Sequence, residues 1–130
     1  MASSLIQHLV SLPPASADVF SRLEDKPEPD WFAASDPPGR PLGSGGGTVH
    51  LLLQAWRKLG SELSFFAWLD QSRKLVVHGG GQSRRLPAYG PSGKVLMPVP
   101  VFRWSLGQRL DQKLLDLEVE TYESLMDWAP

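Results

Sequence analysis

The stretch from Lys74 to Pro100 constrains the fold most, because it joins a short apolar run to a cluster of glycines and cations. The run Leu75–Val77 leads into Gly79–Gly81, and Arg84-Arg85 and then Lys94 follow. Such an apolar run is typical of a strand buried on both faces, and glycines let backbone N–H groups approach a ligand closely. The stretch therefore predicts a strand and a loop that holds a polyanion, such as the phosphate chain of a nucleotide.

Two common phosphate-binding motifs are absent from this stretch. The dinucleotide fingerprint needs a glycine at the sixth position counted from Gly79, where Arg84 stands. The P-loop needs a glycine where Ala88 stands, and a serine or threonine instead of Val95. Any phosphate site here must follow another pattern.

A third pattern is present in the same residues. A strand is followed by Gly80-Gly81, then Arg85-Leu86, then Lys94 and the apolar run Leu96–Val99. This order resembles the signature loop of the sugar-phosphate nucleotidyltransferases, with Ser83 in place of the third glycine and Pro87 directly after Leu86. HGGGQSRRLPAYGPSGK, with SDPPGRPLGSGGGT upstream, looks most like the fucose-1-phosphate guanylyltransferase (GDP-fucose pyrophosphorylase) domain of bifunctional fucokinase enzymes.

The resemblance implies a reaction and a set of site residues. GTP would be the nucleotide donor, L-fucose-1-phosphate the acceptor and Mg²⁺ the cofactor, with the metal ligands outside this chain and none carried over to it. Arg85 would grip the β and γ phosphates, and Lys94 would stabilise the α-phosphate and the leaving pyrophosphate. The residues expected to contact the nucleotide are Gly79, Gly80, Gly81, Gln82, Ser83, Arg84, Gly45 and Gly46.

A second glycine-rich segment, residues 43–48, precedes a periodic apolar run from Val49 to Leu59. One interpretation is a loop that opens a helix, where free N–H groups and the helix dipole favour an anion. The other is a flexible linker with Thr48 as the helix N-cap. The residue pattern leaves both open, and the resemblance favours a role in lining the site.

The fold class expected from the whole chain is α/β, the N-terminal portion of a Rossmann-like nucleotidyltransferase domain. Residues 1–73 are predicted as a helical region containing the loop at 43–48, and residues 74–130 as the first strand, the signature loop and a crossover helix, truncated at the C-terminus. Periodicity predicts helices at Ser4–Val10, Ala15–Leu23, Glu62–Ser72 and Gln108–Trp128, and Trp31–Ala34 as a short strand or a core plug. Gly60 should end the helix that starts near Thr48.

Composition limits the remaining possibilities. The 130 residues carry a net charge of −1, so bulk electrostatics predicts neither nucleic acid nor an anionic membrane as a partner. Without cysteine or a signal-peptide pattern, the cytoplasm is the expected compartment. We expect His78 to be structural, because no metal spacing links it to His8 or His50.

The resemblance also implies a larger polypeptide, possessing a kinase domain in the bifunctional enzymes. The isolated chain is therefore expected to be inactive. Two alternatives stay open: a non-catalytic nucleotide-binding or interaction fragment, and a pyrophosphorylase for another sugar phosphate.

Overall fold

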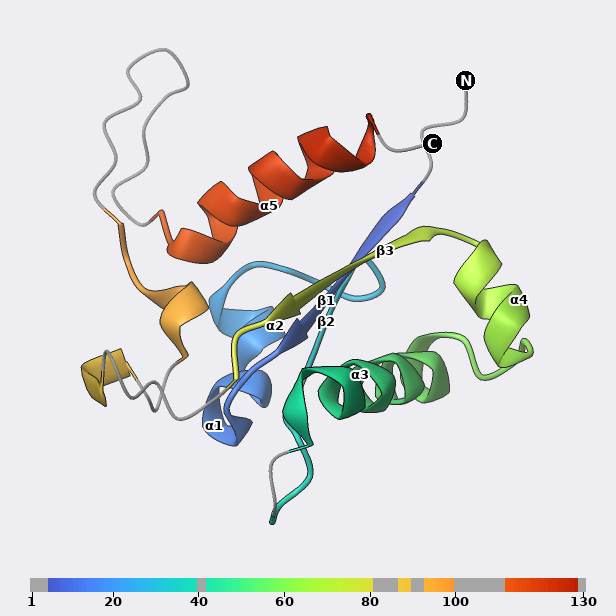
Figure 1. Ribbon diagram of the computed structural model, residues 1–130, viewed down its shortest axis with the longest axis horizontal. Helices are drawn as coiled ribbons and strands as arrows, with labels where there is room; N and C mark the ends of the chain where they lie inside the picture. The colour runs from blue at the N-terminus through green and yellow to red at the C-terminus, as the bar shows by residue number, and fades with distance from the viewer. Residues whose placement is uncertain (1–4, 40–41, 81–86, 90–92, 100–111, 129–130) are drawn as a thin grey trace.

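The fold is α/β, as predicted, and is built around a small parallel sheet (Figure 1). The computed structural model describes residues 5–39, 42–80, 87–89, 93–99 and 112–128. Three strands alternate with helices along the chain. In order, the elements are β1 (Ile6–Ser11), α1 (Pro14–Ala17), α2 (Phe20–Leu23), β2 (Trp31–Ala34), α3 (Gly43–Leu59), α4 (Phe65–Asp70), β3 (Arg73–His78), 3₁₀ turns at Pro87–Tyr89 and Lys94–Leu96, and α5 (Leu114–Met126).

Strand β1 lies at the centre of the sheet, in the order β2-β1-β3. Both neighbours pair with it in parallel, with His8 opposite Trp31 on one side and Leu75 on the other. Helices cover both faces of the sheet, with α3 and α5 on opposite sides (Figure 1). A central strand covered in this way has no wet face, which is why Gln7 through Ser11 are all buried.

Two apolar clusters fill the space between the sheet and its helices. Successive strand residues point to opposite faces, so the adjacent Leu9 and Val10 belong to different clusters, although both are 0% exposed. On the face of Leu9, the cluster contains Leu51 and Ala55 of α3 together with Trp68 of α4. On the face of Val10, its buried members are Leu12, Phe20, Val77, Leu115 and Val119.

The prediction of a helix at Ser4–Val10 is wrong. Ile6–Ser11 form β1 instead, and Arg73–His78 form the third strand of the chain, not the first. The apolar pairs Leu5-Ile6 and Leu9-Val10 fit helical spacing, yet a strand buried on both faces produces the same continuous pattern. Whether so short a run forms a helix or a strand depends on its burial in the folded protein, which its own sequence does not reveal.

Other element predictions agree with the structure in type and differ at the boundaries. Strands form at Trp31–Ala34 and Arg73–His78, and Gly60 ends α3 as predicted. The helix expected at Ala15–Leu23 is divided into α1 and α2. Helix α4 is shorter than predicted, because Ser64 caps its start, accepting a 3.2 Å hydrogen bond from the Ala67 N–H. The predicted helix start at Gln108 lies outside the described residues.

The division into domains at residues 73 and 74 stays a prediction, although strands from both sides of it pair in one sheet. Among the described residues, no helix is long and apolar enough to cross a membrane.

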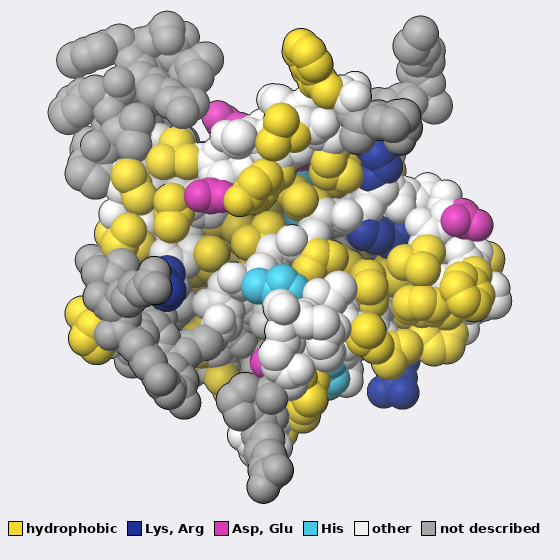
Figure 2. All heavy atoms as spheres, viewed as in Figure 1, with side chains coloured by type: hydrophobic (Ala, Val, Ile, Leu, Met, Phe, Trp, Pro, Cys, Tyr) yellow, Lys and Arg dark blue, Asp and Glu magenta, His cyan; other side chains and the backbone are white. Residues whose placement is uncertain are grey.

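Apolar side chains gather over α4 and the neighbouring part of α3 on the face shown in Figure 2. Phe66 of α4 is the most exposed of these, at 75%.

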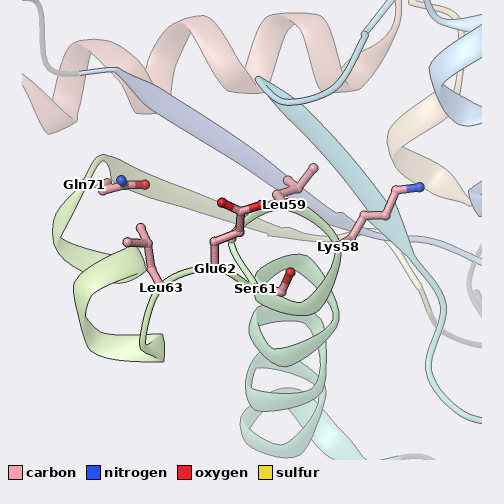
Figure 3. Close-up of a pocket in the computed structure, with 7 residues that line it drawn as sticks. Lys58, Leu59, Ser61, Glu62, Leu63 and Gln71 are labelled. Atoms are coloured by element: carbon pink, nitrogen blue, oxygen red, sulfur yellow. The ribbon is translucent and has the colours of Figure 1, made fainter.

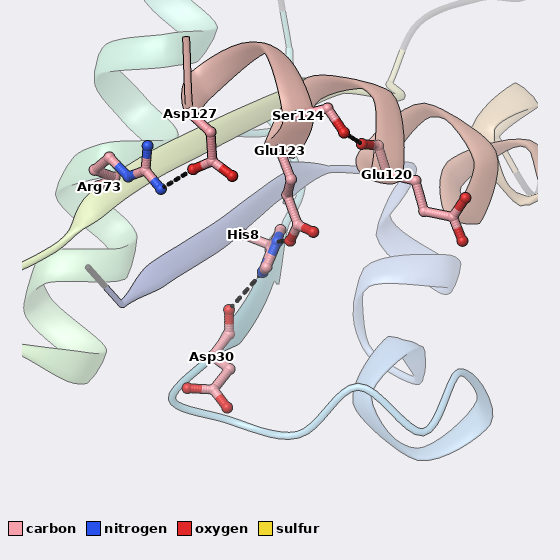
Figure 4. A network of polar contacts seen from close by, with 7 residues as sticks. All are labelled: His8, Asp30, Arg73, Glu120, Glu123, Ser124 and Asp127. Atoms are coloured by element: carbon pink, nitrogen blue, oxygen red, sulfur yellow. Dashed lines mark hydrogen bonds and ion pairs between the residues drawn. The ribbon is translucent and has the colours of Figure 1, made fainter. Parts of the chain in front are cut away.

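Contacts with His8 of β1 and Arg73 of β3 attach the C-terminal part of α5 to the sheet (Figure 4). Glu123 accepts a 2.7 Å contact from Nε2 of the buried His8, and Asp127 pairs with Arg73 at 2.8 Å. At the start of the helix, Lys26 pairs with Asp116 at 2.8 Å. Partly buried pairs of this kind fix the position of a helix more than they stabilise it. They hold α5 against the sheet face that carries His8.

Candidate functional site

The carboxyl ends of the strands form the edge of the sheet where a ligand is expected. In parallel α/β sheets, ligands bind beyond these ends, because the loops that leave the strands gather there. The chain after β3 is tied to the end of β1 by a 2.8 Å hydrogen bond from the Gly79 N–H to the Ser11 carbonyl. The chain after β1 is tied to the end of β2 by a 3.0 Å bond from Leu12 N–H to the Ala34 carbonyl.

Gly79 occupies a tightly packed position at this edge. A Cβ atom placed on it would lie 2.5 Å from Cγ2 of Val95 and 3.0 Å from the carbonyl oxygen of Ser11. Gly93 fits against it from the other side, with φ +82°, and a Cβ there would lie 3.2 Å from the Gly79 carbonyl oxygen. The two glycines therefore allow a close backbone approach that no other residue type permits.

This packing brings Lys94 close to the Gly79-Gly80 segment, the glycine turn. Lys94 follows Gly93 directly and begins a 3₁₀ turn, and its neighbour Val95 packs on Gly79. The lysine side chain is exposed. Gly80, the second residue of the glycine turn, is also exposed. The structure thus places the predicted residues Gly79, Gly80 and Lys94 in one neighbourhood, as a phosphate site would require.

The second glycine segment forms the first turns of α3. Helix α3 begins at Gly43, and the N-cap residue Leu42 provides no side-chain hydrogen bond to its first N–H groups. The prediction of a loop at residues 43–48 is therefore wrong, and so is the interpretation of a flexible linker capped by Thr48. Thr48 lies inside the helix and donates a 2.8 Å hydrogen bond to the Ser44 carbonyl. Among the described residues, apart from its chain neighbours and the backbone of its own helical turn, no atom lies within 4 Å of a Cβ added to Gly45. Its surroundings leave open space at the start of a helix dipole.

A histidine joins the two glycine segments. Nε2 of His78, the last residue of β3, lies 2.8 Å from Oγ1 of Thr48 in α3. Gly79 and Gly80 follow His78 directly, so this contact sets the start of α3 beside the glycine turn. The sequence predicted a structural His78, and it did not predict Thr48 as the partner. The only sequence signal was the position of the histidine immediately before the glycines.

Five of the predicted site residues lie outside the described part of the chain: Gly81, Gln82, Ser83, Arg84 and Arg85. Their roles stay predictions. Gly46 is described, in the first turns of α3, where a Cβ would lie 3.0 Å from Cβ of Leu42.

No group of three or more possible metal ligands occurs within the described residues. A hollow of about 400 Å³ does occur there, lined by Lys58, Gly60, Glu62 and Gln71 among others (Figure 3). It lies between the end of α3 and α4, away from the glycine turn, because α3 runs from the carboxyl edge of the sheet to the opposite edge. None of the predicted site residues lines it.

The described groups with a shifted pKa also lie away from the carboxyl edge. Burial lowers the pKa of Lys74, and nearby Asp70 opposes the shift. Lys74 donates to the Trp68 carbonyl at 2.8 Å and so caps the end of α4. On α5, a side-chain hydrogen bond to Glu118 raises the pKa of Tyr122, and the charge of Glu118 adds to the effect. Neither group bears on the candidate site.

Two longer proteins are similar to this chain. A protein of Bacteroides fragilis named L-fucokinase/L-fucose-1-P guanylyltransferase is 49% identical over 125 residues, which cover 96% of this chain and 13% of that protein. A protein of Arabidopsis thaliana named bifunctional fucokinase/GDP-fucose pyrophosphorylase is 32% identical over 83 residues, which cover 53% of this chain and 8% of that protein. No protein-family model matches the chain, and no solved structure does. The resemblance predicted from the signature loop is thus confirmed, for a chain that spans a small part of each relative.

Proposed function

We propose that this chain, a relative of those two proteins, supplies the nucleotide-binding part of a fucose-1-phosphate guanylyltransferase. The reaction would convert GTP and L-fucose-1-phosphate into GDP-fucose and pyrophosphate. The observation that carries the proposal is the meeting of three features at one sheet edge: the Gly79-Gly80 turn, Lys94 and the glycine-rich start of α3. The N–H groups of a helix N-terminus and a nearby cation together suit a triphosphate.

In the proposed reaction, an oxygen of the sugar phosphate attacks the α-phosphorus of GTP. A new P–O bond forms, the bond to the β-phosphate oxygen breaks, and pyrophosphate leaves with the bonding electrons. Such a transfer needs positioning and charge stabilisation more than covalent help from the protein. Lys94 would act as a point charge on the α-phosphate and the leaving group, and Arg85, from its sequence position, would grip the β and γ phosphates.

Mg²⁺ belongs to the proposal, but the described residues do not provide a site for it, because no ligand cluster occurs among them. We therefore place its ligands elsewhere and route no step through it. We also infer that the chain works within a larger cytoplasmic polypeptide with a kinase domain. The names of both relatives and their greater length support this inference.

Lys94→Ala is expected to weaken GTP binding by the 130-residue chain about tenfold or more, since a charge-assisted contact contributes about 1.5–3 kcal/mol. Isothermal titration with GTP measures the effect. Lys58→Ala is the matched control, because Lys58 is also an exposed lysine, at 60%, and lies near the opposite edge of the sheet. Equal affinities for the two variants would contradict the role of Lys94.

The reaction itself is tested by pyrophosphate release from GTP. We expect release only when L-fucose-1-phosphate is present, in a polypeptide as long as the relatives, and little or none from the chain alone. A panel of other nucleotides and sugar phosphates checks the choice of substrates. Faster release with another pair would contradict the substrate assignment, whereas full turnover by the isolated chain would contradict its partial role.

Gly45→Ala separates a phosphate contact from a purely structural role of the second glycine segment. Because no described residue beyond its own helical turn comes within 4 Å of the added methyl group, the helix should gain about 0.5–1 kcal/mol of stability. The same methyl should weaken GTP binding by about tenfold if a phosphate approaches the backbone there. Ser44→Ala, in the same helical turn, is the control and should leave the affinity unchanged. Undiminished affinity in the Gly45 variant would show that no phosphate approaches this turn.

A further inference from the structure

The hydrogen bonds around His78 determine which of its ring nitrogens carries a proton. The Thr48 hydroxyl has a single hydrogen, and it is donated to the Ser44 carbonyl at 2.8 Å. The hydroxyl oxygen must therefore accept from Nε2 of His78, also at 2.8 Å. In a neutral imidazole this leaves Nδ1 as a hydrogen-bond acceptor. Within the described residues, Nδ1 has no hydrogen-bond partner.

A second acceptor without a partner lies beside Nδ1. A Cβ atom placed on Gly47 would lie 3.9 Å from Nδ1 of His78 and 3.4 Å from Oδ1 of Asp36, so both groups border the same point. Asp36 follows β2 and is exposed, and no hydrogen bond or ion pair occupies its carboxylate within the described residues. The other histidine of this region, His50, already contacts the Ser35 carbonyl at 3.2 Å. Nδ1 of His78 and the carboxylate of Asp36 are therefore two neighbouring free acceptors at the carboxyl edge of the sheet.

The chemistry of these two acceptors determines which part of a ligand could bind to them. A carboxylate repels phosphate, so the triphosphate belongs on the side of Lys94 and the glycine turn. Two neighbouring acceptors suit a neutral group with two hydrogen-bond donors. A nucleoside offers such donors twice, in the ribose hydroxyl pair and in the N–H groups on the edge of guanine. In both cases the donors are uncharged, which removes the cost of facing Asp36.

We propose that His78 and Asp36 bind the nucleoside part of the nucleotide, through hydrogen bonds that its donors make to Nδ1 and to the carboxylate. The inference rests on the proposed function, because it assumes that the phosphates lie at the Gly79 turn. It adds two specificity-determining residues that the signature loop does not include. It also assigns Thr48 a positioning role, because its hydroxyl holds the imidazole in the tautomer that leaves Nδ1 free.

Two amide substitutions separate the two nitrogens of His78. His78→Gln places an amide nitrogen near the position of Nε2, so it keeps a donor for Thr48 but lacks a group at Nδ1. His78→Asn keeps a polar atom near Nδ1 and loses the contact with Thr48. We expect His78→Gln to unfold at the wild-type temperature and to bind GTP about tenfold more weakly, which corresponds to one lost hydrogen bond. His78→Asn should unfold at a lower temperature and lose less affinity.

Titrations with four ligands identify the donor and test the proposal. If His78→Gln does not weaken the binding of 2′-deoxy-GTP, the contact is with the ribose. If His78→Gln does not weaken the binding of inosine triphosphate, the contact is with the guanine edge. Asp36→Asn should weaken GTP binding, and His50→Gln should not. An equal effect of His78→Gln on inorganic tripolyphosphate would overturn the proposal, because that ligand has no nucleoside.

The outcomes also distinguish this inference from the proposed function. GTP binding that depends on Lys94 but is unchanged in His78→Gln and Asp36→Asn overturns the nucleoside contact alone. Absence of GTP binding by the wild-type chain overturns both. The ¹⁵N chemical shifts of the His78 ring test the tautomer without any ligand, and a proton on Nδ1 in place of Nε2 would remove the premise.

Discussion

Replacing Gly60 by alanine is expected to lower the free energy of unfolding by about 3 kcal/mol, the upper end of the usual range for overpacking beside a large buried side chain. The new Cβ atom would lie 2.6 Å from Cγ and 2.8 Å from Nε1 of Trp68, with Cδ1 closer still. Trp68 is only 1% exposed and belongs to the cluster that packs α3 and α4 on the sheet. The indole cannot move away without opening that cluster.

The clash alone accounts for this expectation. Gly60 has φ −143°, outside the left-handed region that favours glycine, so the expected loss is assigned to the clash. Urea unfolding of the two proteins measures the difference, and Gly45→Ala provides a control without a clash. Combining Gly60→Ala with Trp68→Leu should cost less than the sum of the two single changes, because a smaller side chain leaves room for the methyl group. Additive costs, or an unchanged midpoint for Gly60→Ala, would contradict the packing argument.

Gly60 also illustrates how much of a glycine's role a sequence can reveal. Its place after an apolar periodic run predicted the end of α3, and the structure confirms it. Contact with Trp68 was not predictable, because it depends on how α4 folds back onto α3. A local pattern thus identified where α3 ends, while the tertiary contact that makes Gly60 hard to replace did not appear in it.

The strands show the same division between local and tertiary information. Arg73–His78 was predicted because an apolar run before glycines is distinctive, whereas Ile6–Ser11 was assigned to a helix. Its central place in the sheet, with helices on both faces, removed the alternation that would have marked it as a strand. β1 pairs with both neighbours only in the assembled sheet, so the sequence of its six residues does not reveal this pairing.

At the candidate site, the residue pattern and the resemblance singled out the same residues, among them Gly79, Gly80 and Lys94. The structure places these three in one neighbourhood. The contact between His78 and Thr48 joins residues thirty positions apart and arises only when the start of α3 lies beside the end of β3. Nothing in either segment alone indicates the other.

Gly79→Ala should damage both stability and nucleotide binding, and its effect on binding should be the largest of the single changes considered. The added methyl would lie 2.5 Å from Cγ2 of Val95 and 3.0 Å from the Ser11 carbonyl oxygen, which belongs to the central strand and cannot yield. Val95 must therefore shift, and it carries the adjacent Lys94 with it. We expect unfolding to become easier by about 2 kcal/mol, within the range for overpacked sites, and GTP affinity to fall more than tenfold.

Two further variants show whether this loss comes from the contact between Gly79 and Val95. Gly80→Ala is the matched control: its Cβ would meet the Ser11 hydroxyl at 3.2 Å, and a hydroxyl can rotate away. It should change stability by less than about 0.5 kcal/mol, as surface substitutions usually do. Val95→Ala removes the methyl group that collides, so the double variant Gly79→Ala/Val95→Ala should regain part of the stability and affinity lost by Gly79→Ala. If the double variant binds GTP no better than Gly79→Ala does, Val95 is not what positions Lys94 at the glycine turn.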